Sequence, residues 1–192
     1  MNNIAAYILA GGKSQRMGED KGLILVHNKA LINYVIDACK KVCDQVFIVT
    51  NQDIYKQFEL PLIADTIQDA GPAGGIDSIL QHSKTEKNLV VSCDMPCVDP
   101  FSIKKLIEES KSFDITIPLH EPYMEPLLGV YSKQIASQWR SEIWKGNFKL
   151  SDIIAQFAVN FVDAKQLLKY NKHLFANMNN PDDIENLKTW LK

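Results

Sequence analysis

Short runs of β-branched and other apolar residues recur along the chain, and longer stretches with apolar positions three or four residues apart separate several of them. These runs predict seven strands: Ile4–Leu9, Gln45–Thr50, Leu62–Ala64, Leu89–Cys93, Ile115–Pro118, Leu127–Tyr131 and Val159–Val162. Strands that alternate with amphipathic helices are typical of a mostly parallel sheet with helices on its faces. We therefore expect an α/β fold.

Three stretches carry the signals of helices. Leu31 to Val42 places its apolar residues on one stripe, which predicts a helix packed on the sheet. Asp99 and Asn180 are each followed by proline and then by an amphipathic stretch. An Asp or Asn N-cap with proline in the first turn is a common start for a helix, so two further helices are expected at these points.

Length and charge narrow the kind of protein. The 192 residues predict one domain, 1–192, with a sizeable core. The 21 basic and 23 acidic residues leave a net charge of −2, and no basic block stands out. This balance argues against binding to nucleic acid or to an anionic membrane surface. No apolar run is long enough for a membrane span, and the first residues lack the basic start of a signal peptide. We expect a cytoplasmic protein whose partner is a small molecule.

The four cysteines form two pairs with i, i+4 spacing, Cys39/Cys43 and Cys93/Cys97. A zinc site needs four converging ligands, yet no histidine stands at ligand spacing near either pair. Cys39 and Cys43 fall on the predicted first helix, and Cys93 ends a predicted buried strand. Buried free thiols in a reducing cytosol are the expected state.

The first predicted strand is followed by a loop rich in glycine and charge, "LAGGKSQRMGEDKG", from Leu9 to Gly22. A glycine-rich loop can turn several backbone N–H groups toward one anion. Lys13, Arg16 and Lys21 add three cations within nine positions. Since the loop leaves a strand of a parallel sheet, where such folds bind their ligands, we interpret it as a phosphate-binding loop.

Two familiar phosphate-binding motifs do not match this loop. Gly12-Lys13-Ser14 looks like the end of G-x-x-x-x-G-K-[ST], but the position that requires the first glycine is Tyr7. The dinucleotide motif G-x-G-x-x-G fails because Gly11 and Gly12 are adjacent. The sequence therefore predicts neither a P-loop kinase nor a nicotinamide-binding Rossmann protein.

The remaining pattern, L-A-G-G-x(3)-R-M-G-x-D-K, resembles the signature loop of nucleotidyltransferases. Its spacing is most similar to that of the molybdenum cofactor guanylyltransferases, the MobA family. Four further segments resemble that family in order along the chain: "GPAGGI" from Gly71, "CDMP" from Cys93, "EPLLGVY" from Glu125 and "FANMNNPDDI" from Phe175. The resemblance thus covers nearly the whole chain.

The resemblance implies a Rossmann-like, three-layer α/β domain with a mostly parallel central sheet, like that of the nucleotide-diphospho-sugar transferases. It implies a reaction that transfers GMP from GTP to the terminal phosphate of molybdopterin and releases pyrophosphate. Mg²⁺ is the expected cofactor, and molybdoenzymes or their chaperones are expected partners for delivery of the product.

Three residues are expected to carry the chemistry. Asp94 follows the strand "NLVVSC" and is placed to bind magnesium, which accepts one carboxylate together with phosphate oxygens and waters. A turn or helix-cap role is the alternative for this aspartate. Lys21 and Arg16 are expected to hold the triphosphate and stabilise the leaving pyrophosphate.

The resemblance also indicates where the substrates lie. Leu9, Ala10, Gly11 and Gly12 would line the nucleotide through backbone atoms, with Gly74 of the second glycine segment beside it. Asn51 and Asp65 would reach the base and ribose, although Thr50 could align in place of Asn51. Asn177 and Asn179 would complete the pterin or metal side, and helix capping is the alternative for them.

The chain departs from the family pattern at two sites. Asn180 stands where the family usually has threonine, and both residues are good N-caps. The segment "KGNFKLSD" offers only Lys145 and Lys149 where a basic pair usually faces the phosphate of the cofactor. Three alternatives therefore stay open: a molybdopterin cytidylyltransferase, a sugar-phosphate or isoprenoid-precursor nucleotidyltransferase, and a non-catalytic GTP-binding adaptor. Cytidylyl relatives usually have alanine at the position of Gly12, which favours guanine.

Overall fold

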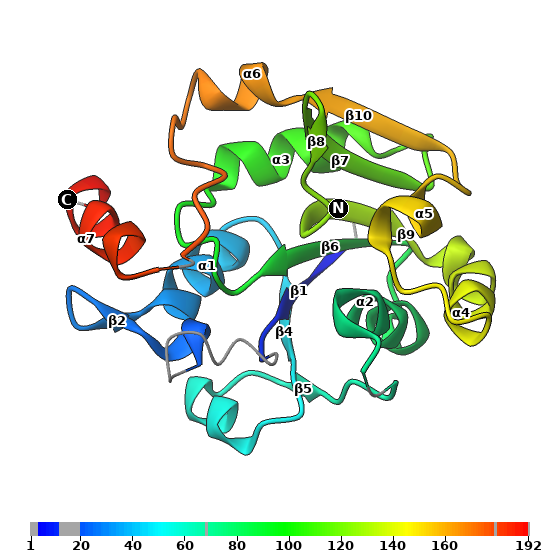
Figure 1. The fold of residues 1–192 in the computed structure, drawn as a ribbon, viewed down its shortest axis with the longest axis horizontal. Coiled ribbons are helices and arrows are strands. Elements are labelled where there is room, and N and C mark those ends of the chain that lie inside the picture. The colour runs from blue at the N-terminus through cyan, green and yellow to red at the C-terminus, as the bar shows by residue number, and fades with distance from the viewer. Residues whose placement is uncertain (1–3, 12–19, 68, 179, 192) are drawn as a thin grey trace.

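The structure is a computed structural model that describes residues 4–11, 20–67, 69–178 and 180–191. The described residues form an eight-stranded sheet with the path β10-β7-β9-β6-β1-β4-β5, and β8 pairs with β7 (Figure 1). The strands of this sheet are β1 (Ile4–Leu9), β4 (Gln45–Val49), β5 (Leu62–Ile63), β6 (Lys87–Ser92), β7 (Ile115–His120), β8 (Tyr123–Met124), β9 (Leu128–Ser132) and β10 (Val159–Asp163). A separate two-stranded ribbon joins β2 (Leu25–Val26) to β3 (Lys29–Ala30).

The strand directions are mostly parallel. β1 pairs in parallel with both β4 and β6, β4 with β5, and β10 with β7. β9 runs antiparallel to both of its neighbours, β6 and β7. The expected mostly parallel α/β sheet is confirmed, and β9 and β8 are its antiparallel members.

Helices cover both faces of the sheet (Figure 1). The helices of the described residues are α1 (Leu31–Lys40), α2 (Gly71–His82), α3 (Pro100–Glu109), α4 (Ala136–Trp144), α5 (Leu150–Ile154), α6 (Ala164–Leu168) and α7 (Pro181–Trp190), with three short 3₁₀ helices at Lys21–Leu23, Asp53–Phe58 and Lys133–Ile135. α7 lies beside the β2/β3 ribbon (Figure 1). Side chains of α1 and α3 pack in one core cluster, whereas those of α2, α4 and α5 pack in another on the opposite face. The result is three layers.

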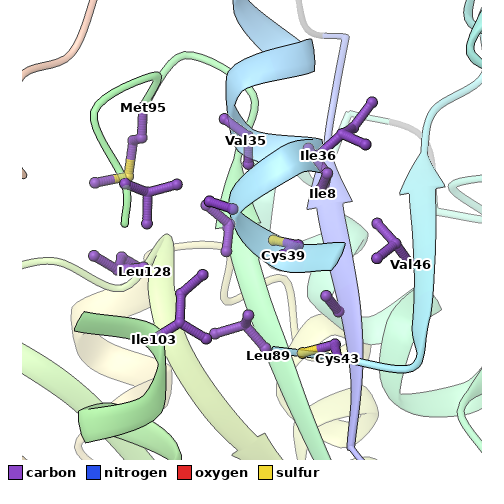
Figure 2. Close-up of a cluster of buried hydrophobic side chains, with 14 of the residues drawn as sticks. Ile8, Val35, Ile36, Cys39, Cys43, Val46, Leu89, Met95, Ile103 and Leu128 are labelled. Atoms are coloured by element: carbon purple, nitrogen blue, oxygen red, sulfur yellow. The ribbon is translucent and has the colours of Figure 1, made fainter. Parts of the chain in front are cut away.

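The alternation of side chains along β1 explains the two cores. Ala6 and Ile8 belong to the α1/α3 cluster, and Ala5 and Tyr7 belong to the α2/α4 cluster. Because successive residues of a strand face opposite sides, a strand buried on both sides must be apolar throughout, as β1 is. Figure 2 shows the first cluster, in which Ile8 of β1 lies among side chains of α1, including Cys39.

All seven predicted strands are present, and their ends differ from the predicted ones by at most two residues. The predicted helix starts at Asp99 and Asn180 are also confirmed. The Asp99 carboxylate accepts the Ser102 N–H, and Asn180 forms a capping box with Asp183. The sequence analysis placed Cys43 on the first helix, which was wrong, because α1 ends at Lys40 and Cys43 lies beyond it.

The four cysteines are free and buried, as predicted. Burial raises the pKa of each thiol, to about 12 for Cys43 and about 11 for Cys97, so all four stay protonated at neutral pH. Among the described residues, no helix combines the length and the hydropathy needed to cross a lipid bilayer.

Candidate active site

One edge of the sheet gathers most of the predicted site residues. β1, β4, β5 and β6 are parallel, so their carboxyl ends meet at this edge and place Gly11, Asn51, Asp65 and Asp94 just beyond them. β9 is antiparallel to β6, and the residues that precede it, including Glu125, therefore reach the same edge. Ligands of open α/β sheets bind at the carboxyl ends of strands.

Lys21 and Asp94 meet at this edge. The Lys21 Nζ lies 3.4 Å from the Asp94 Oδ2, and the two side chains are 15% and 20% exposed. The other oxygen of Asp94, Oδ1, accepts a hydrogen bond of 2.6 Å from the Ser92 hydroxyl. One oxygen of the Asp94 carboxylate is thus fixed by Ser92, and the other faces the Lys21 ammonium group. Both side chains remain partly exposed, so ligands can still reach them.

A second, deeper set of contacts fixes the backbone beside Lys21. Asp20 is the N-cap of the 3₁₀ helix Lys21–Leu23, and its Oδ1 accepts from the Gly22 N–H at 3.0 Å. The same oxygen accepts from the Tyr55 hydroxyl at 2.5 Å. Tyr55 is fully buried, and burial raises the pKa of its phenol, so the hydroxyl keeps its proton and acts as the donor. Sequence reasoning named Asp20 only as part of the motif R-M-G-x-D-K, with no role, and missed Tyr55.

Asn51 and Asp65 lie together, as expected from their places after β4 and β5. The Asn51 side chain donates to the Asp65 carbonyl at 3.1 Å and accepts from the Asp65 N–H at 2.9 Å. Both ends of its amide therefore brace the Asp65 backbone. The Asp65 Oδ1 accepts from the Ile67 N–H and the Ser78 hydroxyl. Burial, with Asp77 nearby, raises the pKa of the Asp65 carboxyl despite these hydrogen bonds.

The second glycine segment forms the start of α2, which the sequence analysis had not predicted to be a helix. A Cβ at Gly75 would lie 2.5 Å from the Leu9 Cδ2. A Cβ at Gly74 would lie 3.0 Å from the Ile67 carbonyl oxygen and 3.3 Å from the Asp65 Oδ1. The two glycines thus let α2 approach both the end of β1 and the Asp65 loop.

The backbone at the end of β1 is partly used by the sheet itself. The Ala10 N–H donates to the Val49 carbonyl, and the Leu9 carbonyl accepts from the Cys93 N–H, both at 3.0 Å. Gly11 is exposed and has a φ of +86°, which favours glycine. The Ala10 N–H is therefore engaged within the sheet, and the nucleotide-lining role expected for Leu9 and Ala10 stays a prediction.

Glu125 is a further carboxylate at this edge, and sequence reasoning named only the motif that contains it. Its pKa is raised by burial and by the charge of Asp94, and lowered by His120. The Ser92 N–H donates to the Leu127 carbonyl at 2.9 Å, which ties this loop to the end of β6. In the strand order β9-β6-β1-β4-β5, Glu125 precedes β9 and therefore lies on the side of Asp94 opposite to Asn51 and Asp65. An acidic residue directly before the proline of "EPLLGVY" was the available signal.

The last predicted segment also reaches the site. The Met178 N–H donates to the Asp94 carbonyl at 3.2 Å, so Asn177 lies beside the segment that carries the site aspartate. Gly12, Arg16 and Asn179 lie outside the described residues, and their expected roles stay predictions.

The donor set at Asp94 fits a hard, oxygen-preferring cation that completes its shell with substrate. Among the described residues, no group of three or more His, Cys, Asp and Glu side chains could hold a metal by itself. Asp94 is one reachable carboxylate whose orientation Ser92 fixes. Mg²⁺ is commonly bound by one or two carboxylates, waters and phosphate oxygens, so this site suits it only together with a phosphate ligand.

Comparison with known proteins agrees with this geometry. The MobA-like NTP transferase domain matches residues 6–160. A probable molybdenum cofactor guanylyltransferase of Flavobacterium johnsoniae is 34% identical over 188 residues, which are 97% of each chain. Another from Carboxydothermus hydrogenoformans is 29% identical over 97% of this chain and 96% of its own.

A solved structure extends the likeness to three dimensions. The molybdopterin-guanine dinucleotide biosynthesis protein A of Archaeoglobus fulgidus has a TM-score of 0.84 and 27% sequence identity, over 96% of this chain and 97% of that one. The expected fold class and resemblance are both confirmed. The chain is a nucleotidyltransferase that belongs to the MobA-like NTP transferase family.

Proposed function

We propose that this protein transfers GMP from GTP to molybdopterin and releases pyrophosphate. The observation that carries the proposal is the Lys21–Asp94 pair, 3.4 Å apart, at an edge with Asn51 and Asp65 on one side and Glu125 on the other. The donor nucleotide and the acceptor phosphate would meet between these two sides. The relatives named molybdenum cofactor guanylyltransferases support the choice of substrates.

The reaction brings two anions together, so the main task of the site is to neutralise charge and align the groups. Asp94 would hold Mg²⁺, which supplies positive charge to the phosphate oxygens when bound. Lys21 would donate to the α- and β-phosphates and stabilise the charge that develops on the leaving pyrophosphate. Asp65, braced by Asn51, would accept hydrogen bonds from the ribose or the base.

The choice of guanine over cytosine is tested by binding. GTP with Mg²⁺ should raise the melting temperature, and CTP at equal concentration should raise it much less. At a concentration 100-fold above Kd, a ligand stabilises the fold by about 2.7 kcal/mol, which is readily visible in a melting curve. An equal or larger shift with CTP would assign the protein to the cytidylyl branch.

Turnover separates the enzyme from a binding protein. Release of pyrophosphate from GTP, dependent on both molybdopterin and Mg²⁺, is the expected result. Binding of GTP without any release would instead support the non-catalytic adaptor. Delivery of the product to molybdoenzymes or their chaperones, in the reducing cytoplasm that four free thiols suit, belongs to the same proposal.

A further inference from the structure

The structure assigns Asp20 and Tyr55 to catalysis as positioning residues, which act through Lys21 without touching the substrates. The assignment rests on the proposed function for its kinetic consequence. Its structural basis is the hydrogen-bonded chain from the Tyr55 hydroxyl to the Asp20 Oδ1 and on to the Gly22 N–H, at 2.5 and 3.0 Å. Lys21 lies in sequence between Asp20 and Gly22, the two residues that this last hydrogen bond joins.

These hydrogen bonds determine the backbone conformation at Lys21, and so the direction in which its side chain leaves the backbone. Asp20 has extended backbone (φ −69°, ψ 122°), and Lys21–Leu23 turns at once into a 3₁₀ helix. A three-residue 3₁₀ helix has little stability of its own. The Asp20 cap adds a side-chain hydrogen bond to the two backbone bonds of this turn, and the turn directs the Lys21 Nζ toward the Asp94 Oδ2.

Tyr55 holds the cap in place from outside the loop. It is fully buried and belongs to the 3₁₀ helix Asp53–Phe58, 35 residues from Asp20 in sequence. A Cβ at Gly22 would lie 2.5 Å from the Tyr55 hydroxyl and 3.2 Å from the Cys93 Sγ. The backbone beside Lys21 is thus clamped between Tyr55 and the residue that precedes Asp94.

Folding stability alone does not account for the carboxylate of Asp20. Its second oxygen, Oδ2, is buried and has no hydrogen-bond partner among the described residues. A buried polar atom without a partner costs about 1–3 kcal/mol. Asp20 therefore lowers folding stability through its unsatisfied oxygen while it fixes the backbone of a catalytic lysine. Such a combination is typical of functional sites.

Tyr55→Phe tests the assignment, because it removes only the hydroxyl and keeps the packed ring. We expect kcat for pyrophosphate release to fall about tenfold, the loss of about 1.4 kcal/mol of transition-state stabilisation, with KM for GTP within about twofold. Tyr34→Phe is the matched control, since its hydroxyl donates to the Val26 carbonyl and not to Asp20. It should keep the wild-type kcat. A kcat for Tyr55→Phe within twofold of wild type would overturn the assignment.

A double-mutant cycle distinguishes positioning from a general structural effect. In a Lys21→Ala background, Tyr55→Phe should change kcat by less than about twofold, because the side chain that it positions is gone. A second tenfold loss in that background would show that Tyr55 does not act through Lys21. Asp20→Asn retains an acceptor oxygen and should recover most of the activity that Asp20→Ala loses. Equal loss in both variants would contradict the hydrogen-bonding role.

One measurement needs no substrate and separates this inference from the proposed function. Exchange of the Gly22 amide proton should quicken about tenfold in Tyr55→Phe, because its acceptor Asp20 loses a restraint. Unchanged exchange would overturn the inference whatever the substrates are. Wild-type protein without turnover, combined with the expected faster exchange, would instead overturn only the proposed function.

Discussion

Replacement of Asp94 by asparagine separates the proposed catalytic role of this carboxylate from its structural role. Asparagine has the same shape, and its amide oxygen can still accept the hydrogen bond from the Ser92 hydroxyl. Its NH₂ group then takes the place of Oδ2, opposite the Lys21 ammonium. Two hydrogen-bond donors face each other there, and the negative charge is lost.

The Lys21–Asp94 distance gives the magnitude of the effect on the fold. At 3.4 Å and an effective dielectric constant of 20, the Lys21–Asp94 attraction is about 5 kcal/mol before the cost of desolvation. Desolvation and solvent screening offset most of it, since both side chains keep some exposure, so the fold should lose about 1 kcal/mol. Turnover should lose far more, about 4 kcal/mol or a thousandfold, because an amide is a poor replacement for an anionic magnesium ligand.

The assay is pyrophosphate release over a range of Mg²⁺ concentrations, with a melting curve on the same preparation. Asp99→Asn is the matched control, because Asp99 also pairs with a serine hydroxyl, that of Ser102, but caps α3. It should keep turnover near the wild-type rate. Turnover of Asp94→Asn within tenfold of wild type at saturating Mg²⁺ would refute the metal role and leave Asp94 as a turn residue.

Three other substitutions have expected outcomes. Lys21→Ala should lower kcat about a hundredfold, or 2.7 kcal/mol, while Kd for GTP rises less than tenfold; equal small changes in both would reduce Lys21 to uniform binding. Arg140→Ala should lower the free energy of unfolding by about 3 kcal/mol in denaturant titration, because it leaves the fully buried Asp77 carboxylate without its 2.6 Å partner; a loss below 1 kcal/mol would contradict this. Asp65→Asn should raise the melting temperature at pH 7, because the raised pKa of Asp65 means that ionisation disfavours the folded state. The wild-type penalty is absent at low pH and develops as pH rises above the ordinary aspartate pKa of about 3.9, so the gain should vanish in melts below that pH.

Seven strands of the sheet could be predicted because a buried strand corresponds to an apolar run in the sequence. β2, β3 and β8 were missed, and two residues carry no periodicity. β5 is equally short but was predicted from its apolar run Leu62–Ala64. α2 was missed for another reason. Its first turns contain Gly71, Gly74 and Gly75, which argue locally for a loop, yet the last two are needed where the helix approaches Asp65 and Leu9. Tertiary contact overrode local preference there.

The site was predictable where a motif places a residue at a strand end, as for Asp94 and Asp65. It was not predictable where two distant segments meet through one hydrogen bond. Tyr55 belongs to a short 3₁₀ helix with no recognisable motif, and nothing in the sequence pairs it with Asp20. Glu125 was hidden for a similar reason, because its position depends on β9 running antiparallel.

Because β9 is antiparallel to β6, the residues that precede it join the site from a different part of the chain than the residues that follow β1, β4, β5 and β6. β9 enters the sheet at the edge where β6 leaves it, and register with β6 holds from Lys87–Ser132 to Val91–Leu128. The segment between β7 and β9 therefore reaches the site, and both of its ends are fixed in strands of the sheet. Outside β8, which pairs with β7, such a segment tolerates insertion, deletion or exchange without a shift of the sheet beneath it. Under the proposed function, acceptor specificity would diversify by changes in residues 121–127 while the strands assigned to the nucleotide, β1, β4 and β5, stay as they are.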